Sequence, residues 1–350
     1  MTRLIVALVL LVTWGCGPSD DQTRDLPSVE LWAGDDRVDV TVDGRPFTSY
    51  LYATAIPAVK KPILYPVYAP SGRRVTRGFP LDPVPGERAD HPHHIGMWLN
   101  HGDVNDLDFW NNSDAIDPTD SLRYGSIRHT GVVDVTGGRE RGTLDVVAEW
   151  LSPRGVALLE EQTRFIFEAA LEAWSIDRIT TLTALEDSVV FEDSKEGMMA
   201  IRVARALEQV TGRADPFVTN DGSLSERVVS NDGATGRYLS SAGLEGDAVW
   251  GRRASWTALT GEIEGEMVTI AIFDHPSNVN YPTHWMARGY GLFAANPLGS
   301  HDYTDGAERL DYTLAPGESV TFRYRMLIHS GPRPSSEWLD EQQVRFAAND

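Results

Sequence analysis

The chain has little sulfur and little positive charge. Its 350 residues include one cysteine, so no disulfide can form within the chain and a disulfide-stapled scaffold is excluded. Lys and Arg total 31 against 51 Asp and Glu, which gives a net charge of -20. Such a surface repels nucleic acid and anionic lipid, and we expect neither as a direct partner. The acidic residues are spread along the chain, which favours a solvated surface over an acidic tail.

Several well-known catalytic motifs are also missing. The sequence has no Gly-rich dinucleotide fingerprint, no phosphate loop, no Gly-x-Ser-x-Gly elbow and no His-Glu-x-x-His helix. Hydride transfer, ATP use, serine hydrolysis and zincin proteolysis are therefore disfavoured.

Long apolar runs are absent except at the N-terminus, where Leu4 to Val12 is uninterrupted hydrocarbon after a single Arg. The run is too short to span a bilayer and is typical of an export signal. Cys16 follows after Thr13, Trp14 and Gly15 and fits a lipidation site, although ordinary signal-peptidase cleavage or a buried N-terminal segment would also fit the run. We expect a lipoprotein signal peptide over residues 1–15, a tether over 16–30 and one domain over 31–350. The protein would then be exported and lipid-anchored, in the periplasm or at the cell surface.

Period-two alternation of apolar and polar residues recurs through the chain and predicts strands. The clearest ranges are 37–42, 45–54, 129–136, 143–151, 162–169, 175–184 and 321–328. Turns rich in Gly, Asn and Asp separate these ranges; Asp43-Gly44, for example, lies between 37–42 and 45–54. One helix is predicted, from a Ser335 cap to Ala347. Many short strands without strand–helix alternation predict an all-β fold, a large antiparallel β-sandwich with a short C-terminal helix.

Histidines are concentrated in the segment from Asp90 to Trp110, which holds four of the nine in the chain. A second segment, from Asp274 to Gly299, repeats the tripeptide Asp-His-Pro and holds two more, with His301 just beyond it. Imidazole titrates nearest neutral pH and is the commonest metal ligand, so this concentration indicates chemistry or ligand binding. We expect the two segments to converge on one concave site.

These two segments, with Lys195 to Ala204 between them, resemble the bacterial DUF6807 family over about residues 35–330. The family is also labelled methane oxygenase PmoA, but a methane monooxygenase subunit is a multi-span membrane protein, which this chain cannot be. The resemblance implies an all-β sandwich, of the mutarotase-like super-sandwich type, and a setting of sugar degradation beside sugar oxidoreductases. It implies no catalytic residues.

Three roles are open for the histidines. The first is metal-free acid–base chemistry on a sugar, with no cofactor. The candidate catalytic residues are His91, His94, Asp103, Glu196 and His275, with His94 or His91 transferring the proton. The second is a divalent metal site, with candidate ligands His91, His93 and His275. Against it, no Glu follows the His-x-His before Arg123, unlike cupin-type sites. The third is a structural role, in which the imidazoles only fix a long loop.

Tryptophan rings beside the histidines indicate a carbohydrate ligand, because flat indole faces pack against the C–H faces of sugars. The candidate substrate-binding residues are His93, Trp98, Asn105, Trp110, Lys195, Arg202, His284, Trp285, Arg288, Tyr290 and Asn296. We expect a carbohydrate lyase, hydrolase or epimerase that acts on a sugar or keto-glycoside. The alternatives are a glycan-binding lipoprotein without activity and a metal-dependent enzyme.

Overall fold

Two antiparallel sheets, packed face to face, form the protein. The computed structural model describes residues 26–52, 56–211, 215–225 and 230–348. The first sheet has nine strands, in the order β16 (His284–Ala287), β17 (Leu292–Asn296), β12 (Gly197–Arg202), β5 (Met97–His101), β4 (Ile63–Leu64), β3 (Arg45–Leu51), β2 (Arg37–Val42), β1 (Ser28–Ala33) and β7 (Gly138–Arg139).

The second sheet has eight strands, in the order β13 (Arg237–Ser240), β14 (Trp256–Ile263), β15 (Glu266–Asp274), β19 (Ser319–Ser330), β10 (Ala173–Ala184), β9 (Ala157–Ala169), β8 (Arg141–Leu151) and β6 (Ser126–Thr136). A small third sheet pairs β11 (Val189–Phe191) with β18 (Tyr312–Leu314). The helices are α1 (Ser300–Tyr303) and α2 (Ser336–Ala347), with short 3-10 turns η1 (Pro118–Arg123), η2 (Arg205–Leu207) and η3 (Gly246–Val249).

The main core lies between the two large sheets and is built from alternate residues of their strands. Phe47 of β3 contacts Phe167 of β9 and Trp174 of β10, with ring centroids 6.0 and 4.9 Å apart. All three rings are buried. Because the side-chain period of a strand is two, the residues between these core positions point to the outer faces of the sandwich.

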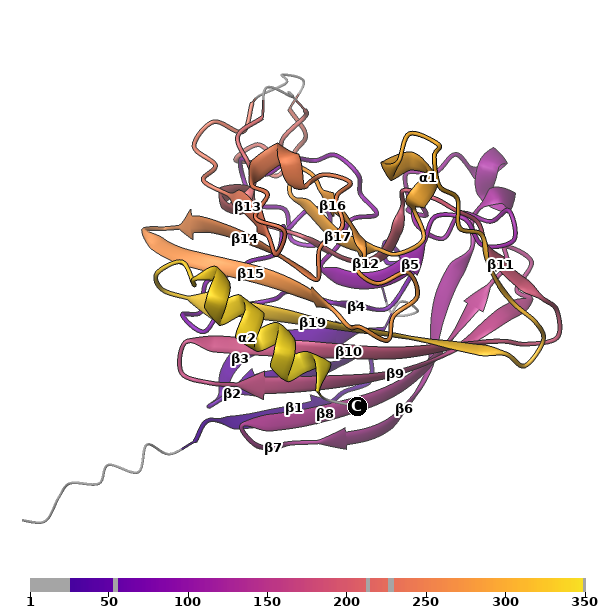
Figure 1. Cartoon of the computed structure of the whole chain (residues 1–350), viewed down its shortest axis with the longest axis horizontal. Helices are drawn as coiled ribbons and strands as arrows, with labels where there is room; N and C mark the ends of the chain where they lie inside the picture. Colours follow the sequence, from indigo (N-terminus) through magenta and orange to yellow (C-terminus); the bar gives the residue numbers. More distant parts are fainter. Residues whose placement is uncertain (1–25, 53–55, 212–214, 226–229, 349–350) are drawn as a thin grey trace, which may run out of the picture.

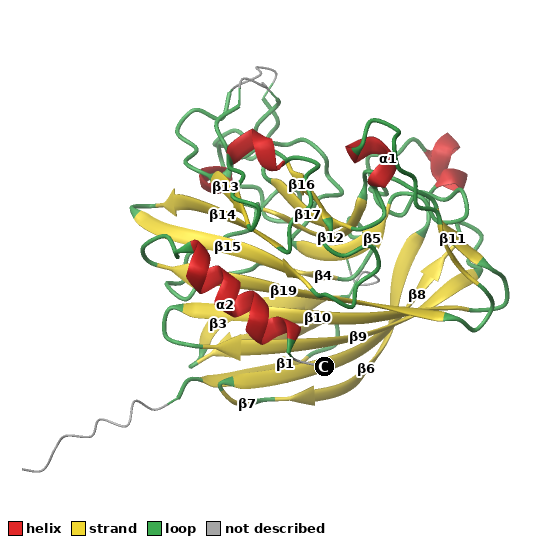
Figure 2. Ribbon diagram, viewed as in Figure 1, coloured by secondary structure: helices red, strands yellow, loops and turns green. Residues whose placement is uncertain are grey.

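Each large sheet also has a second apolar layer on its outer face. Outside the eight-stranded sheet, α2 lies across β15, β19 and β10 (Figure 1) and packs Leu339 and Phe346 on the sheet. Outside the nine-stranded sheet, Trp98 of β5 and Ala200 of β12 belong to a buried cluster of their own. Loops rather than a long helix cover this face, around β16, β17, β12 and β5 (Figure 2).

The predicted fold class is confirmed: the sheets are antiparallel throughout their named strand pairs, and α2 runs to Ala347 as expected, with Ser335 as its N-cap. The hairpin at Asp43-Gly44 joins β2 to β3. The tether expected over residues 16–30 is too long at its C-terminal end. Strand β1 already begins at Ser28, and β1 pairs with β2 and β7. The expected signal peptide and Cys16 lie outside the described residues. Within the described ranges, no helix is both long and apolar enough to cross a bilayer.

Candidate functional site

The first histidine segment forms a column of stacked rings on the outer face of the nine-stranded sheet. In order, the ring column consists of Tyr290, His91, His94 and Trp98. Tyr290 and His91 are 5.2 Å apart and nearly coplanar at 1°, His91 and His94 are 4.8 Å apart at 4°, and His94 and Trp98 are 5.5 Å apart at 18°. Trp98 reaches this face because its neighbours in β5, Met97 and Leu99, point into the main core.

A buried carboxylate holds the column in place. Asp90 Oδ1 accepts hydrogen bonds from Arg77 at 2.7 Å and from Arg202 at 2.6 Å, and its Oδ2 lies 2.8 Å from His91 Nδ1. Burial raises the pKa of Asp90, but Arg202, the bond with His91 and Arg77 together lower that pKa well below its usual range. Asp90 is therefore an anion at any physiological pH, and His91 must carry its proton on Nδ1.

Arg77 also braces the loop that carries the histidines. Its guanidinium donates to the carbonyl oxygens of Arg88, Asp90, His91 and His94, at distances between 2.8 and 3.2 Å. His91 has a left-handed backbone, with φ of 43°, which is uncommon for a residue other than glycine. Such conformations persist only where the surroundings fix them, and they cluster at functional sites.

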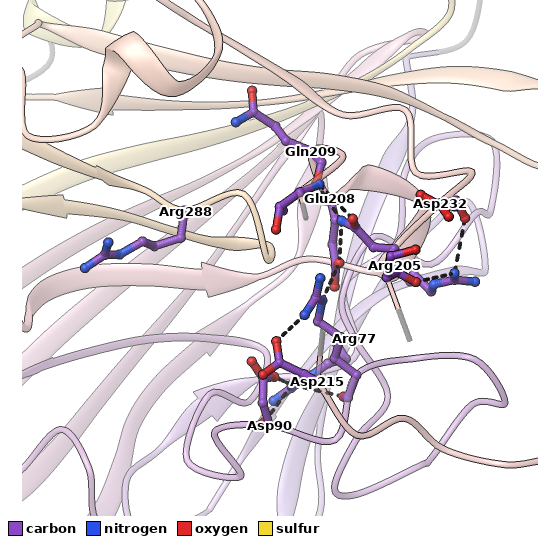
Figure 3. A network of polar contacts seen from close by, with 12 residues as sticks. Arg77, Asp90, Arg205, Glu208, Gln209, Asp215, Asp232 and Arg288 are labelled. Atoms are coloured by element: carbon purple, nitrogen blue, oxygen red, sulfur yellow. Dashed lines mark hydrogen bonds and ion pairs between the residues drawn. The ribbon is translucent and has the colours of Figure 1, made fainter. Parts of the chain in front are cut away.

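A wider set of buried ion pairs surrounds this arrangement. Figure 3 shows Arg77 and Asp90 close to Asp215 and Glu208, while Arg288 points away from them. Arg88 joins Glu208, at 2.9 Å, to Asp215. Asn231 donates to Glu208 at 2.9 Å. These contacts fix the segments on either side of the ring column.

His94 is locked in the neutral state. It is 1 % exposed, and each ring nitrogen faces an obligatory donor: Trp110 Nε1 lies 3.2 Å from Nε2, and Arg202 Nη1 lies 3.3 Å from Nδ1. Imidazolium has N–H groups at both positions and could accept from neither donor, whereas the neutral ring accepts from one donor through its bare nitrogen and turns its remaining N–H toward the other. Burial, His93 and Arg202 lower the pKa of His94 well below its usual value. Of the two proposed proton-transfer histidines, only His91 is partly exposed, at 29 % of its side chain.

Lys61, which sequence reasoning missed, adjoins the column on the Trp98 side. Its ammonium nitrogen lies 5.2 Å from the Trp98 ring and donates to the His93 carbonyl at 3.0 Å. The residue is 3 % exposed, and among the described residues no carboxylate lies within 4.0 Å of it. Burial, opposed by Asp108, lowers the pKa of Lys61 to about 7. The sequence signal was a lysine pair set between apolar residues in Ala58 to Leu64.

The structure brings about half of the predicted site residues together here. Those in or against the ring column are His91, His93, His94, Trp98, Trp110, Arg202 and Tyr290. Sequence reasoning also missed Asp90 and Arg77 as parts of the site. Asp90 is marked by its place directly before His91, whereas nothing in the linear sequence links Arg77 to the motif.

A second group lies toward α1, at the other end of β5, β12 and β17. Glu196 accepts from Asn111 at 2.6 Å and lies 3.7 Å from the Lys195 ammonium. Asn296 donates to the Ser194 carbonyl at 2.9 Å. The His284 ring stacks on Tyr303 at 5.1 Å.

The remaining predicted site residues have other surroundings. Asp103 is half-buried, and burial with nearby Glu192 raises its pKa. Asn105 ties its loop to Ser188 and Val190 through hydrogen bonds of 3.2 and 2.7 Å. Trp285 is buried in the main core.

The expected convergence of the two Asp-His-Pro segments is wrong. His275 follows β15 of the other sheet, and its ring contacts Phe346 of α2 at 5.2 Å, on the opposite outer face of the sandwich from His94. There Asp274 accepts from Asn278 and from Thr283 N at 2.7 and 2.8 Å, so the second Asp-His-Pro closes a loop. Only the later part of the second segment, through Tyr290, reaches the ring column.

The expected metal ligands do not assemble either. His275 lies on the far face, and the stacked rings of His91 and His94 direct their in-plane lone pairs along parallel planes instead of toward one point. Within the described part of the chain, no group of three or more His, Cys, Asp or Glu side chains is placed to hold a metal ion.

Comparison with known proteins assigns the family. Residues 37–342 match the model of a family of unknown function, DUF6807. The chain belongs to this family. The comparison with curated proteins gives no match.

Several solved structures share a distant likeness with this DUF6807 protein. A galactose mutarotase-like protein from Clostridium acetobutylicum is 12% identical with a TM-score of 0.38, covering 88% of this chain and 99% of that one. Galactose 1-epimerase from Lactobacillus acidophilus is 10% identical with a TM-score of 0.34, covering 88% and 100%. A beta-arabinopyranosidase is 9% identical with a TM-score of 0.32, covering 88% of this chain. The chain spans only 39% of that protein's length.

Replacing Asp90 by Asn tests the buried carboxylate. The change leaves Arg77 and Arg202 buried without a counter-charge, and we expect a loss of about 3–5 kcal/mol in the free energy of unfolding. The matched control is Asp145→Asn, which breaks an ion pair with a largely exposed Arg164 and should cost at most about 1 kcal/mol. Urea denaturation measures both. Equal small losses would contradict the role given to Asp90.

Replacing Lys61 by Met tests the role of its buried ammonium group, through the pH dependence of the free energy of unfolding. In the unfolded chain Lys61 stays protonated to about pH 10.4, whereas its pKa in the fold is about 7. Between these values the unfolded state binds more protons, so wild-type stability rises with pH. We expect the stability advantage of Lys61→Met to be largest near pH 7 and to shrink by about 1.4 kcal/mol per pH unit above it. Lys60→Met, at the neighbouring half-buried lysine paired with Asp114, should show no such trend. A difference independent of pH for Lys61→Met would refute the assignment.

Proposed function

We propose that the protein binds a sugar or an oxidised sugar beside His91 and acts on it by acid–base chemistry, with His91 as the proton-transfer residue. The observation that carries this proposal is the pair formed by Asp90 and His91, in which a permanently anionic carboxylate fixes a partly exposed imidazole.

The geometry of this pair determines which nitrogen can react. Asp90 accepts the Nδ1 proton of His91, so the lone pair of the neutral ring is on Nε2. Among the described residues Nε2 has no hydrogen-bond partner. A base oriented by a carboxylate in this way can take a proton from a sugar carbon or hydroxyl group and return it. Proton transfer of this kind is common to the lyase, hydrolase and epimerase reactions that the sequence left open.

The surroundings of His91 suit a carbohydrate. Tyr290 is half-buried and stacks on His91, and half-buried Trp250 carries the guanidinium of Arg288 on its ring, at 3.4 Å. Aromatic faces that are partly open to solvent pack against the C–H faces of a sugar, and charged side chains beside them bind its oxygen atoms. A shallow binding surface without catalysis would use the same rings, so the proton-transfer role needs its own test.

We further propose that the protein is exported and lipid-anchored through Cys16. The support is the sequence alone, an apolar run followed by the single cysteine. Fractionation of cells should place the wild-type chain with the membranes and a Cys16→Ala variant in the soluble exported fraction. A wild-type chain that stays soluble would rule out the anchor.

Replacing His91 by Gln tests the proton-transfer role. A screen of glycosides and 3-keto-glycosides should identify one that raises the melting temperature of the wild-type protein and is turned over. Because Gln keeps a polar side chain but cannot exchange protons, His91→Gln should lower turnover by about 100-fold or more while the ligand still binds.

The matched control is His129→Gln. His129 also stacks on a tyrosine, Tyr52, at 4.2 Å and is half-buried, but it lies on β6 of the other sheet. This variant should keep wild-type turnover. If no sugar shifts the melting temperature, the carbohydrate proposal fails; if a sugar binds and wild type never converts it, only the catalytic part fails.

A further inference from the structure

We propose that Arg288 recognises a carboxylate on the ligand, so that the natural ligand is an acidic sugar, such as a uronic acid or a glycoside of one; this inference rests on the proposed function. It names the class of sugar that the His91 surface would take.

Arg288 differs from the buried arginines in having no carboxylate beside it among the described residues. Each of the five arginines that are buried in the described part of the chain has a carboxylate partner: Arg77 and Arg202 pair with Asp90, Arg88 with Glu208, Arg178 with Glu161, and Arg325 with Asp177. Among the described residues, no carboxylate oxygen lies within 4.0 Å of the Arg288 guanidinium, and its buried Nε has no acceptor. This occurs in a chain with 51 acidic residues, so carboxylates are not scarce.

The guanidinium is nevertheless held in a defined orientation. Its central carbon lies 3.4 Å from the centroid of the Trp250 ring, close enough for a face-to-face stack. The backbone is fixed as well, because Arg288 N donates to the Leu292 carbonyl at 2.9 Å and the Tyr238 hydroxyl donates to the Arg288 carbonyl at 3.2 Å. A guanidinium stacked on an indole keeps its N–H donors in its own plane, at the edge of the stack, where a planar carboxylate can accept two of them.

The backbone at Arg288 lies beside the ring column, and its side chain extends from there toward Trp250. The turn between β16 and β17 carries both Arg288 and Tyr290, and the Tyr290 ring stacks on His91. Two residues along a chain separate Cα atoms by at most about 7 Å, which is the size of one sugar ring. Figure 3 shows the Arg288 side chain directed away from the Asp90 network, so the two cationic groups do not compete for one anion.

The acidic side chain of Glu196 does not neutralise Arg288, so the guanidinium is available to an anion of the ligand. The Glu196 carboxylate is engaged by Asn111 at 2.6 Å and lies 3.7 Å from the Lys195 ammonium. The net charge of -20 repels an acidic ligand at long range, but salt screens that repulsion beyond about 8 Å under physiological conditions. Recognition therefore depends on the short-range contact with the guanidinium.

Binding measurements with matched acid and amide ligands test the inference. Glucuronate, galacturonate and mannuronate, their neutral amides and the parent hexoses are titrated calorimetrically into the full chain. We expect wild type to bind at least one acid at least tenfold more tightly than its amide. Arg288→Met should lose at least tenfold in affinity for the acid and less than twofold for the amide.

Two variants separate recognition from folding and from general charge. Arg288→Lys keeps the positive charge but loses the planar fork, so it should also lose most of the preference for the acid. Arg252→Met removes an exposed arginine near Trp250 and should leave both affinities unchanged. Circular dichroism and melting confirm that each variant folds.

The outcomes distinguish this inference from the function on which it rests. If neutral hexoses or amides bind as tightly as the acids, or if Arg288→Met keeps the acid preference, the role of Arg288 is refuted and the carbohydrate surface stands. If no sugar in the series binds, the role of Arg288 is refuted, and the separate screen of glycosides and 3-keto-glycosides decides the proposed function.

Discussion

A single buried carboxylate, Asp90, determines how the outer face of the nine-stranded sheet is arranged. Two guanidinium groups and one imidazole share its two oxygens. Taking three such groups out of water is costly unless each is paired, so the position of every partner depends on the others. Arg202 comes from β12 and Arg77 from the loop after β4, so the carboxylate joins segments that are distant in sequence.

The ring column follows from this arrangement. Because Asp90 fixes Nδ1 of His91 and Arg202 faces His94, the two imidazoles lie parallel, and the sheet supplies Trp98 beneath them. The inner histidine, His94, is held between two donors and remains neutral. The outer one, His91, is partly exposed, and its Nε2 has no hydrogen-bond partner within the described part of the chain. Adjacent histidines thus have different chemistry, set by which donors and acceptors surround each ring. Lys61 adds a buried amine beside the Trp98 end of the same column.

Much of the fold could be predicted from the sequence, because strand periodicity and turn residues are local. The hairpin at Asp43-Gly44 and the Ser335 cap of α2 depend on neighbours a few residues away. That His91, His93 and His94 lie together could also be predicted, because they are neighbours in the sequence. The two Asp-His-Pro tripeptides look equivalent in the sequence, yet one lies before β5 and the other ends β15 in the opposite sheet. Strand order decides that difference, and neither composition nor spacing encodes strand order. Arg77 and Lys61 were missed for the same reason.

The protonation state of the two stacked histidines tests this account most directly. Nitrogen-15 chemical shifts of the imidazoles, assigned with His91→Gln and His94→Gln, can be followed from about pH 5 to about pH 8. We expect one protonated and one bare nitrogen on His94 across the whole range, and a proton on Nδ1 of His91 throughout. A His94 ring that gains a second proton near pH 6.5, or a neutral His91 protonated on Nε2, would contradict this expectation.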